Sequence, residues 1–318
     1  MAYQVDQDIS VTLETSTTDQ PHRKKSFLGR VQFGPYLLIA PAILIILLAL
    51  GYPLIWQFVT SLQKYGRAQV FGQPPEFVGL QNYVDLFTDS YMWLVVGRSI
   101  AFCLIVAATT MLVGVLIALL MRSAPKWVRL CIQISLLLAW AMPVVAVMTI
   151  WSWLFDWRRG LVNWALGTSG HNWLENPLSF FMVAGIIVVW MSVPFVAFSI
   201  YAGLTQVPTE VLEAASMDGA SPIQQLSRII VPMIKPVLGI VFLLQIIWDL
   251  RVFTQIYMLQ SQGSNPSETN LLGTYIYQLG VGRGDFGTAS AVSIFVLGLT
   301  VLLSWGYVRY LMKEESDA

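Results

Sequence analysis

Long apolar runs separated by short polar segments dominate this chain of 318 residues. A helix needs about 20 apolar residues to cross a bilayer core about 30 Å thick. Six windows satisfy this requirement, and they cover roughly residues 36 to 62, 93 to 121, 127 to 155, 179 to 204, 237 to 259 and 288 to 311. The pattern therefore predicts an all-α integral membrane protein with six transmembrane helices.

Prolines lie inside or at the ends of several of these windows. Each proline removes a backbone donor and frees the carbonyl one turn earlier, which lipid tolerates only beside neighbouring helices or a water-filled cavity. They are either ordinary kinks that aid helix packing or markers of a substrate pathway. The five are Pro41, Pro53, Pro143, Pro194 and Pro236.

The composition agrees with a membrane protein. Hydrophobic residues make up 56% of the chain and charged residues 11%, whereas a soluble domain has about 25% charged residues. Eighteen basic residues balance eighteen acidic ones, so no basic field indicates nucleic acid as a partner. Cys103 and Cys131 both lie in apolar windows, and we therefore expect no disulfide and no metal site.

The placement of basic residues predicts which side of the membrane the polar segments face. Residues 1–30 are polar and predict a flexible tail, and residues 31–318 are expected to form one transmembrane domain. With six spans both termini share one side, which carries eleven Lys and Arg against five on the other. By the positive-inside rule, both termini and the segment at about 205–236 are expected in the cytoplasm.

A polar, helix-forming segment, EAASMDGASPIQQLSRIIVP at Glu213–Pro232, lies between the fourth and fifth spans. Pro208 and Thr209 predict the start of a helix. Gly219 predicts a break, and Pro222 begins a second helical run to about residue 230. The segment is therefore expected to form a helix, a turn and a helix, either as a solvated connector or as a docking element for another protein.

This segment resembles the cytoplasmic EAA signature of the membrane subunits of binding-protein-dependent ABC importers. Residues 194 to 208, PFVAFSIYAGLTQVP, are similar to the lead-in typical of the carbohydrate-importing branch. Residues 77 to 87, FVGLQNYVDLF, are similar to its first external loop. The signature itself is carried by Glu213-Ala214-Ala215, Gly219, Ile229 and Val231-Pro232.

The resemblance implies a coupling helix that seats in a groove on a separate ATPase subunit. By position, Glu213 would be the acidic contact to the ATPase and Gly219 the turn that lets the chain fold back. A carboxylate near a helix start is also favourably placed relative to the helix dipole. The other members of the expected coupling set are Ala214, Ala215 and Met217, which would form the packing face, and Asp218.

The fifth span has one polar and aromatic face. On a continuous helix, an arc of about 160° holds Gln245, Trp248, Asp249, Arg251 and Gln255. An ionisable group such as Asp249 is costly near the middle of a span unless it faces a partner or a cavity. Either these residues bind a sugar through aromatic, carboxylate and amide groups, or Asp249 is a structural group neutralised by Arg251 or by a partner subunit.

The resemblance adds to this hypothesis. In maltose-type permeases the corresponding stretch of the helix contributes sugar contacts, which implies the same role for Trp248 and Asp249. It implies a similar role for Ser192 and Phe195, which flank Pro194 in the fourth span. The Gly-rich external segment at residues 260 to 287 is expected to be flexible, and it either docks a binding protein or is a plain linker.

Together these features predict the permease subunit of an ATP-driven ABC importer, which is not an enzyme and forms half of the pathway for a di- or oligosaccharide. The expected partners are ATPase subunits, a second homologous permease that makes a heterodimer, and an extracytoplasmic sugar-binding protein. The chain contains no G-x-x-x-x-G-K-[ST] phosphate loop, so ATP and Mg²⁺ are expected on the ATPase and no cofactor on this chain. Alternatives are an importer permease for a polyol phosphate such as glycerol 3-phosphate, a secondary transporter, or a signalling or structural membrane protein.

Overall fold

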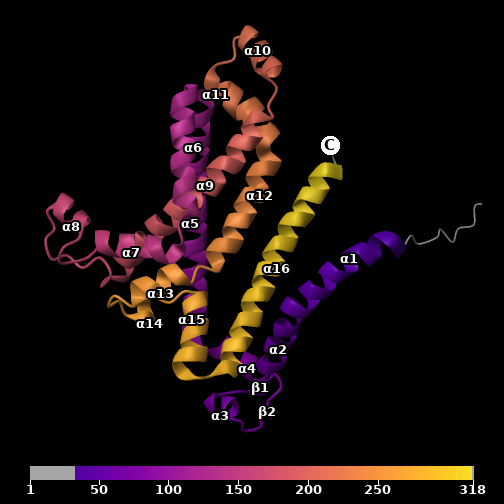
Figure 1. The fold of residues 1–318 in the computed structure, drawn as a ribbon, viewed down its shortest axis with the longest axis vertical. Helices are drawn as coiled ribbons and strands as arrows, with labels where there is room; N and C mark the ends of the chain where they lie inside the picture. The colour runs from indigo at the N-terminus through magenta and orange to yellow at the C-terminus, as the bar shows by residue number, and fades with distance from the viewer. Residues whose placement is uncertain (1–32, 317–318) are drawn as a thin grey trace, which may run out of the picture. The chain divides into compact units, whose positions relative to one another are not determined.

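Helices make up most of the structure, a computed structural model that describes residues 33–316 (Figure 1). The tail predicted at residues 1–30 lies outside the described residues. Two short strands, β1 (Gln63–Lys64) and β2 (Glu76–Phe77), pair antiparallel. The described residues contain five helices long and apolar enough to cross a membrane, or six when one bent pair is counted as a span. The predicted all-α membrane fold is confirmed.

Two compact units, Met1–Tyr52 and Pro53–Ala318, are described separately. The described part of the first contains α1 (Phe33–Ile46) and η1 (Leu47–Gly51). Residues Leu38–Ser61 form one candidate span, and none of its apolar window is buried in this single chain. Such a helix needs lipid or another subunit to cover it.

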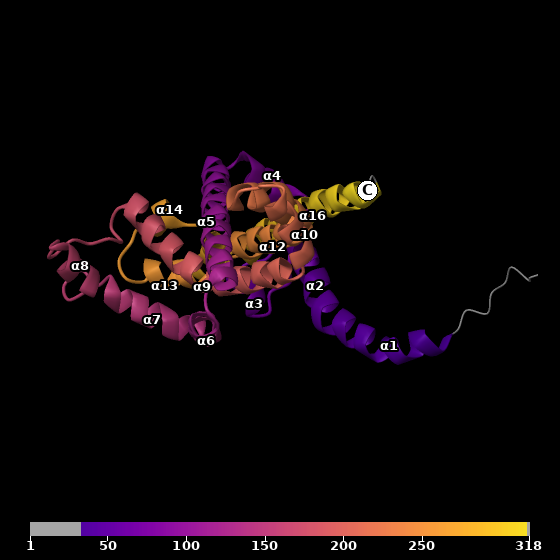
Figure 2. The same ribbon diagram turned by 90° about the horizontal axis from the view of Figure 1, so that it is seen from above.

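Three long helices form the centre of the second unit: α5 (Ser90–Ser123), α9 (Pro177–Thr205) and α12 (Val231–Leu250). α5 packs along α9, and α12 contacts both (Figures 1 and 2). A Cβ atom at Gly114 of α5 would lie 2.5 Å from Cγ1 of Val196 in α9. This glycine therefore permits the close approach of two helices that membrane proteins achieve with small residues.

Pro143 breaks the predicted third span. α6 (Lys126–Ala141) and α7 (Val144–Leu154) meet at an angle of 100°. Between them, Met142 has an extended backbone, the conformation favoured for a residue before proline. The prediction of a continuous helix over residues 127 to 155 is therefore wrong.

The fifth span also differs from its prediction. It begins earlier, because the helix runs without interruption from α11 (Pro222–Gln225) through η2 (Leu226–Ile230) into α12. It is broken at residues 251–253, after which α13 (Thr254–Gln260) begins. The predicted span over residues 237 to 259 falls within the candidate span Pro222–Gln260, but the break places Gln255 on α13 and Gln245 on α12.

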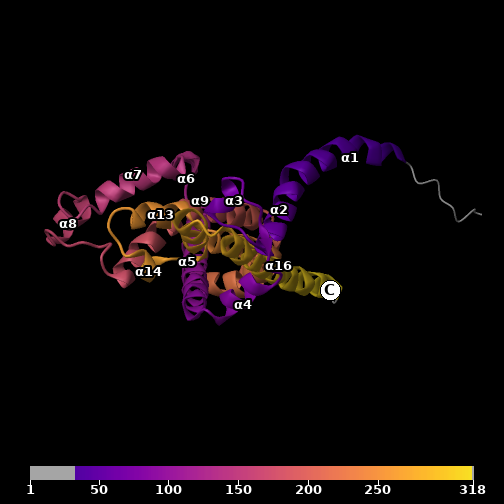
Figure 3. The same cartoon turned by 90° about the horizontal axis from the view of Figure 1, so that it is seen from below.

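Shorter elements complete the second unit. α10 and α4 lie at opposite ends of the central helices in Figure 1, and Figure 3 views the end that carries α3, α4 and α14. These elements are α2 (Tyr52–Ser61), α3 (Arg67–Val70), α4 (Gln81–Thr88), α8 (Leu161–Leu166), α10 (Thr209–Met217), α14 (Pro266–Thr269), α15 (Leu272–Tyr277), η3 (Gln278–Arg283) and α16 (Phe286–Ser316).

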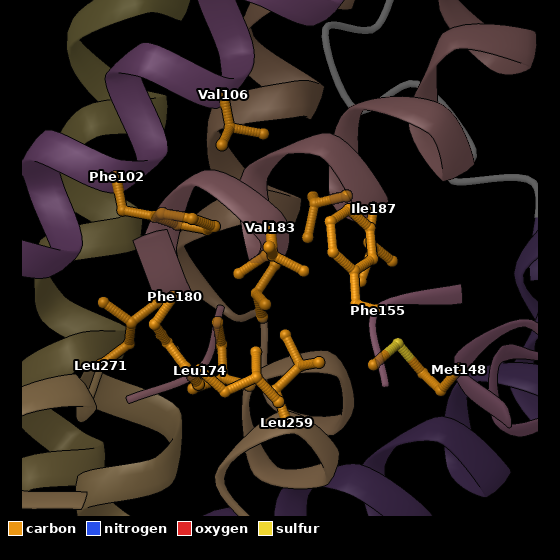
Figure 4. Close-up of a cluster of buried hydrophobic side chains, with 14 residues drawn as sticks. Phe102, Val106, Met148, Phe155, Leu174, Phe180, Val183, Ile187, Leu259 and Leu271 are labelled. Carbon is orange, nitrogen blue, oxygen red and sulfur yellow. The ribbon is translucent and has the colours of Figure 1, made fainter. Parts of the chain in front are cut away.

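A buried apolar cluster anchors the segments that follow both breaks (Figure 4). α9 supplies Val183 and Ile187, which are fully buried, and α5 supplies Phe102. Met148 of α7 and Leu259 of α13 are buried in the same cluster. Packing against the central helices therefore fixes the direction in which each broken segment leaves its break.

The segment between α13 and α16 is folded against α5. Asn270, which is 1% exposed, donates through Nδ2 to the hydroxyl of Tyr91 at 3.1 Å and to Oε1 of Gln278. Its Oδ1 accepts from Nε2 of Gln260 at 3.1 Å. Arg98 of α5 donates to its main-chain oxygen at 3.2 Å. The prediction of a flexible segment here is therefore wrong.

A second tie joins α15 to the start of α5. The hydroxyl of Tyr275 donates to Oδ2 of Asp89 at 3.2 Å, and Oδ1 of Asp89 accepts from the backbone N–H of Tyr91 at 2.8 Å. Burial, reinforced by the Asp89 carboxylate, raises the pKa of Tyr275 to about 12. The phenol therefore keeps its proton at neutral pH, and the hydrogen bond persists.

Replacing Asn270 tests this network. Asn270→Ala removes the donor to Oε1 of Gln278 and one of the two acceptors of Gln260, which keeps Thr269, and should lower the free energy of unfolding by about 1–3 kcal/mol. The measurement is the Tm of the purified protein in detergent. Gln73→Ala is the control, since Gln73 is exposed and its side chain makes no hydrogen bond within residues 33–316. Equal Tm values for the two variants would contradict the role of the network.

Candidate functional site

Both helix breaks open onto one cavity of about 230 Å³. Val144, the first residue of α7, lines it from the first break. The end of α12 and the start of α13 line it from the second break, and α9 closes it from the side. Broken helices at membrane depth are a common place for substrate sites in transporters. The predicted substrate residues on its wall are Ser192, Trp248, Asp249, Arg251 and Gln255.

Asp249 is 3% exposed and is held by its own helix. Nε2 of Gln245, one turn earlier and fully buried, donates to both carboxylate oxygens at 2.9 and 3.0 Å. Oε1 of Gln245 is buried without a partner among the described residues. Gln245 therefore lies behind the cavity and orients Asp249.

The structural pairing of Asp249 with Arg251 is absent. Within the part of the chain that the structure describes, no ion pair joins these two side chains. Arg251 lies just beyond the end of α12, where it is exposed and lines the cavity. Its guanidinium group is therefore available to a ligand.

Other polar groups on the cavity wall are also unused. Neither the hydroxyl of Ser192 nor the indole N–H of Trp248 makes a hydrogen bond within residues 33–316. Trp248 is 43% exposed although it lies within a candidate span. Gln255 donates only to the sulfur of Met191, at 3.6 Å. A few convergent polar groups beside an aromatic ring make a wall suited to a small polyhydroxylated ligand.

Phe195 supports the indole ring of Trp248. Their ring centroids lie 4.8 Å apart with an interplanar angle of 59°. On its other side, Phe195 lies 6.4 Å from the ring of Trp140 in α6. Sequence reasoning missed Val144, which lines the cavity directly after the break, and Trp140, which contacts Phe195. Pro143 was the available signal for the break.

A larger cavity, of about 860 Å³, is poorly suited to a polar ligand. It lies between α5, α6 and α9 and is lined almost wholly by apolar side chains. Its polar members are engaged, since Thr109 donates to the carbonyl of Ile105 at 2.8 Å and Arg98 donates to the carbonyl of Asn270. A lipid tail or a partner helix fits this surface better than a sugar does.

The coupling segment presents an exposed surface at the opposite end from α4 (Figure 1). Leu212 of α10 packs against the apolar core and attaches the helix to the bundle. Glu213 and Ala214 are exposed, and Met217 is 89% exposed. Of the remaining residues predicted for coupling, Ala215 is half-buried and Asp218 is exposed.

Gly219 ends α10 in a tight turn. Its φ of +81° is a left-handed conformation that favours glycine. The N–H of Ala220 donates to the carbonyl of Ala215 at 2.9 Å, and the N–H of Gly219 donates to the carbonyl of Ser216 at 3.1 Å. This is a Schellman motif. Gln225 of α11 donates to the hydroxyl of Ser216 at 2.9 Å and fixes the second helix against the first.

Comparisons with known sequences agree with this geometry. Residues 110–310 match the model of a family described as "Binding-protein-dependent transport system inner membrane component". The chain is 37% identical to the diacetylchitobiose uptake system permease protein of Streptomyces coelicolor, over 89% of this chain and 88% of that protein. It is 32% identical to the trehalose/maltose transport system permease protein of Thermococcus litoralis, over 86% and 92%.

Solved structures share the fold. A chain of a bacterial alginate ABC transporter, in complex with an alginate-bound periplasmic protein, superposes with a TM-score of 0.73. It is 21% identical, and the match covers 86% of this chain and 92% of that one. A chain of the MetNI methionine ABC transporter matches with a TM-score of 0.52 and 16% identity, over 70% of this chain and 95% of that one.

The Gln245–Asp249 pair can be tested by a double-mutant cycle. Gln245→Met leaves the buried Asp249 carboxylate without its donor and should lower the free energy of unfolding by about 1–3 kcal/mol. Adding Asp249→Leu removes the orphaned group and should recover most of this loss, because exchanging both partners for apolar groups is nearly neutral. Thermal unfolding in detergent measures each variant. Additive losses would show that the two side chains are not coupled.

Proposed function

Because the chain belongs to the family of binding-protein-dependent transport system inner membrane components, we propose that it is the permease subunit of an ATP-driven importer for a di- or oligosaccharide. Members of this family are transport components and not enzymes. Family membership also argues against a self-sufficient secondary transporter and against a signalling or structural protein.

The observation that carries the proposal is the cavity at the two helix breaks. Polar and ionisable groups are costly inside a membrane span unless they face a cavity or a partner. Trp248, Asp249 and Arg251 all line the cavity at the two helix breaks. The face of Trp248 would stack on the C–H surface of a sugar ring. Ser192, Arg251 and Gln255 would bind its hydroxyls, with Asp249 oriented by Gln245. The relatives named as permeases of diacetylchitobiose and trehalose/maltose transport systems support this substrate class.

The exposed face of α10 supports a coupling role. Met217 of α10 and Ile223 of α11 are large apolar side chains that are 89% and 78% exposed, and they lie on the same segment as the exposed carboxylate of Glu213. The proposed partner is a cytoplasmic ATPase subunit that holds ATP and Mg²⁺, with Glu213 as the acidic contact. Under this proposal α10 and both termini face the cytoplasm of a bacterial cell, in agreement with the excess of basic residues on that side.

Two further partners complete the proposal. A second homologous permease would form the other half of the pathway, and an extracytoplasmic binding protein would deliver the sugar. The apolar window of Leu38–Ser61 is not buried among the described residues, and a second permease would cover part of it. A binding protein accompanies the alginate transporter that shares the fold.

An anionic substrate is the second candidate. Arg251 has no acidic partner among the described residues and lines the cavity, as a phosphate ligand would require. Asp249 on the same wall opposes this interpretation, because its carboxylate repels an anion. A polyol phosphate such as glycerol 3-phosphate is therefore the alternative to a neutral sugar.

Purification of the native complex tests the proposed function. The chain would be tagged in its own host, extracted in a mild detergent and analysed by mass spectrometry for co-purifying proteins. We expect an ATPase, a second permease and a binding protein. The purified complex in proteoliposomes should then take up radiolabelled diacetylchitobiose, trehalose or maltose with ATP inside, and glycerol 3-phosphate is the competing probe. Recovery of the chain alone, without an ATPase, would refute the proposal.

Glu213→Ala should uncouple transport. Loss of a hydrogen bond to a charged group costs about 1.5–3 kcal/mol, so ATPase stimulation and uptake should fall about tenfold or more. The free energy of unfolding should not change, because Glu213 is exposed. The assay is ATP hydrolysis by the reconstituted complex, with Tm as the check on folding.

Glu210→Ala is the matched control for this variant. Glu210 lies one turn earlier on the same helix and is also exposed, and it carries the same charge. Its loss should leave ATPase stimulation within about twofold of the parent. Equal effects of the two variants would show that only the net charge of α10 matters.

A further inference from the structure

We propose that the groove between α6 and α9 is a second carbohydrate subsite, which receives the sugar units that extend beyond the cavity at Trp248. This inference rests on the proposed function, and it adds a second sugar-binding position to the proposed pathway. The groove has a volume of about 550 Å³ and is separate from the cavity at the two helix breaks.

The first argument is size. Sites for small ligands usually have volumes of about 300–1,000 Å³. The cavity at Trp248, of about 230 Å³, falls below this range. Further sugar units need space outside this chain's cavity, which either the second permease or the groove can supply, and the groove at about 550 Å³ is large enough.

The second argument is a continuous row of aromatic rings. Trp140 and Phe195 both line the groove. Phe195 also contacts the ring of Trp248 on the cavity wall, with centroids 4.8 Å apart. The centroids of Trp140 and Phe195 lie 6.4 Å apart at an interplanar angle of 32°. The row thus connects the two sites, and Trp140, 54% exposed, presents an indole ring on which a sugar can stack.

The third argument is the polar lining. Gln133 of α6 and Ser199 of α9 both line this otherwise apolar groove. Neither side chain makes a hydrogen bond within the part of the chain that the structure describes. A lipid tail cannot form hydrogen bonds with an amide or a hydroxyl, whereas the hydroxyls of a sugar can form them with both.

The position of the groove gives the order of the two sites. Ser199 lies two turns after Ser192 on α9, about 10 Å along the helix axis. α9 ends at Thr205, directly before the coupling segment. The groove therefore lies between the cavity and the end of the molecule that carries α10, and a sugar would reach it after leaving Trp248.

Cysteine labelling distinguishes a sugar subsite from a surface covered by lipid or by a partner helix. Ser199→Cys would be made in a chain whose exposed thiol is removed by Cys131→Ser. The complex purified with its native partners would be placed in nanodiscs and treated with a charged, water-soluble methanethiosulfonate. The probe sugar is the one of diacetylchitobiose, trehalose and maltose that the parent complex transports.

We expect the thiol at position 199 to be labelled and the sugar to protect it. At a sugar concentration roughly ten times the Kd, mass action makes labelling about tenfold slower. Leu112→Cys is the control, since Leu112 is an exposed side chain of α5 that lines neither site, and it should show no sugar protection. Gln133→Cys gives an independent position on the facing helix if Ser199→Cys fails to assemble.

Two results would overturn the proposal. Absence of labelling at both positions in an assembled complex would mean that lipid or the partner permease fills the groove. Labelling that the sugar does not slow would mean that the groove is wet but is not a subsite. Neither result touches the proposed function, which fails only if the parent complex lacks an ATPase or moves no sugar.

Discussion

A peptide group inside a membrane must be hydrogen-bonded within the protein or face water, and the arrangement of this chain depends on that constraint. An unbroken helix hydrogen-bonds its own backbone groups within the span. Each break leaves backbone donors and acceptors that other protein groups or water must hydrogen-bond. The chain has one break at Met142–Pro143 and another at residues 251–253. Both open onto a single cavity, so the segments that most need polar surroundings share the same place.

Side-chain packing of the segments that follow the two breaks stabilises both breaks. Met148 and Leu259, from the helices that follow the two breaks, are buried against α5 and α9. A Cβ at Gly273 of α15 would lie 3.0 Å from the carbonyl oxygen of Val252, so this glycine lets the segment at residues 260 to 287 approach the second break closely. The hydrogen bonds of Asn270 then tie that segment to α5. A flexible linker could not provide such support.

Hydropathy predicts much of this fold from the sequence, because the cost of burying polar groups in lipid decides where spans lie. The polar face of the fifth span likewise identified Trp248, Asp249 and Arg251, which share a cavity wall. The break at residues 251–253 could not be predicted, since no Pro or Gly marks it and its cause is tertiary packing by α15. The segment at 260 to 287 was misjudged for the same reason: its glycines indicate flexibility, while its order comes from contacts with residues far away in sequence.

The uninterrupted helix from Pro222 to Leu250 links the two candidate sites in a way that the sequence did not reveal. α11 is fixed to α10 through Gln225, and the far end of α12 carries Trp248 and Asp249. The backbone hydrogen bonds of a helix fix its rise per residue. A displacement of α11 along the helix axis therefore also displaces Trp248, unless the helix bends between them. Three features permit bending: the π segment Leu226–Ile230, Pro232 and Pro236. The geometry of this one helix therefore limits how a force on the exposed face of α10 can move the cavity wall.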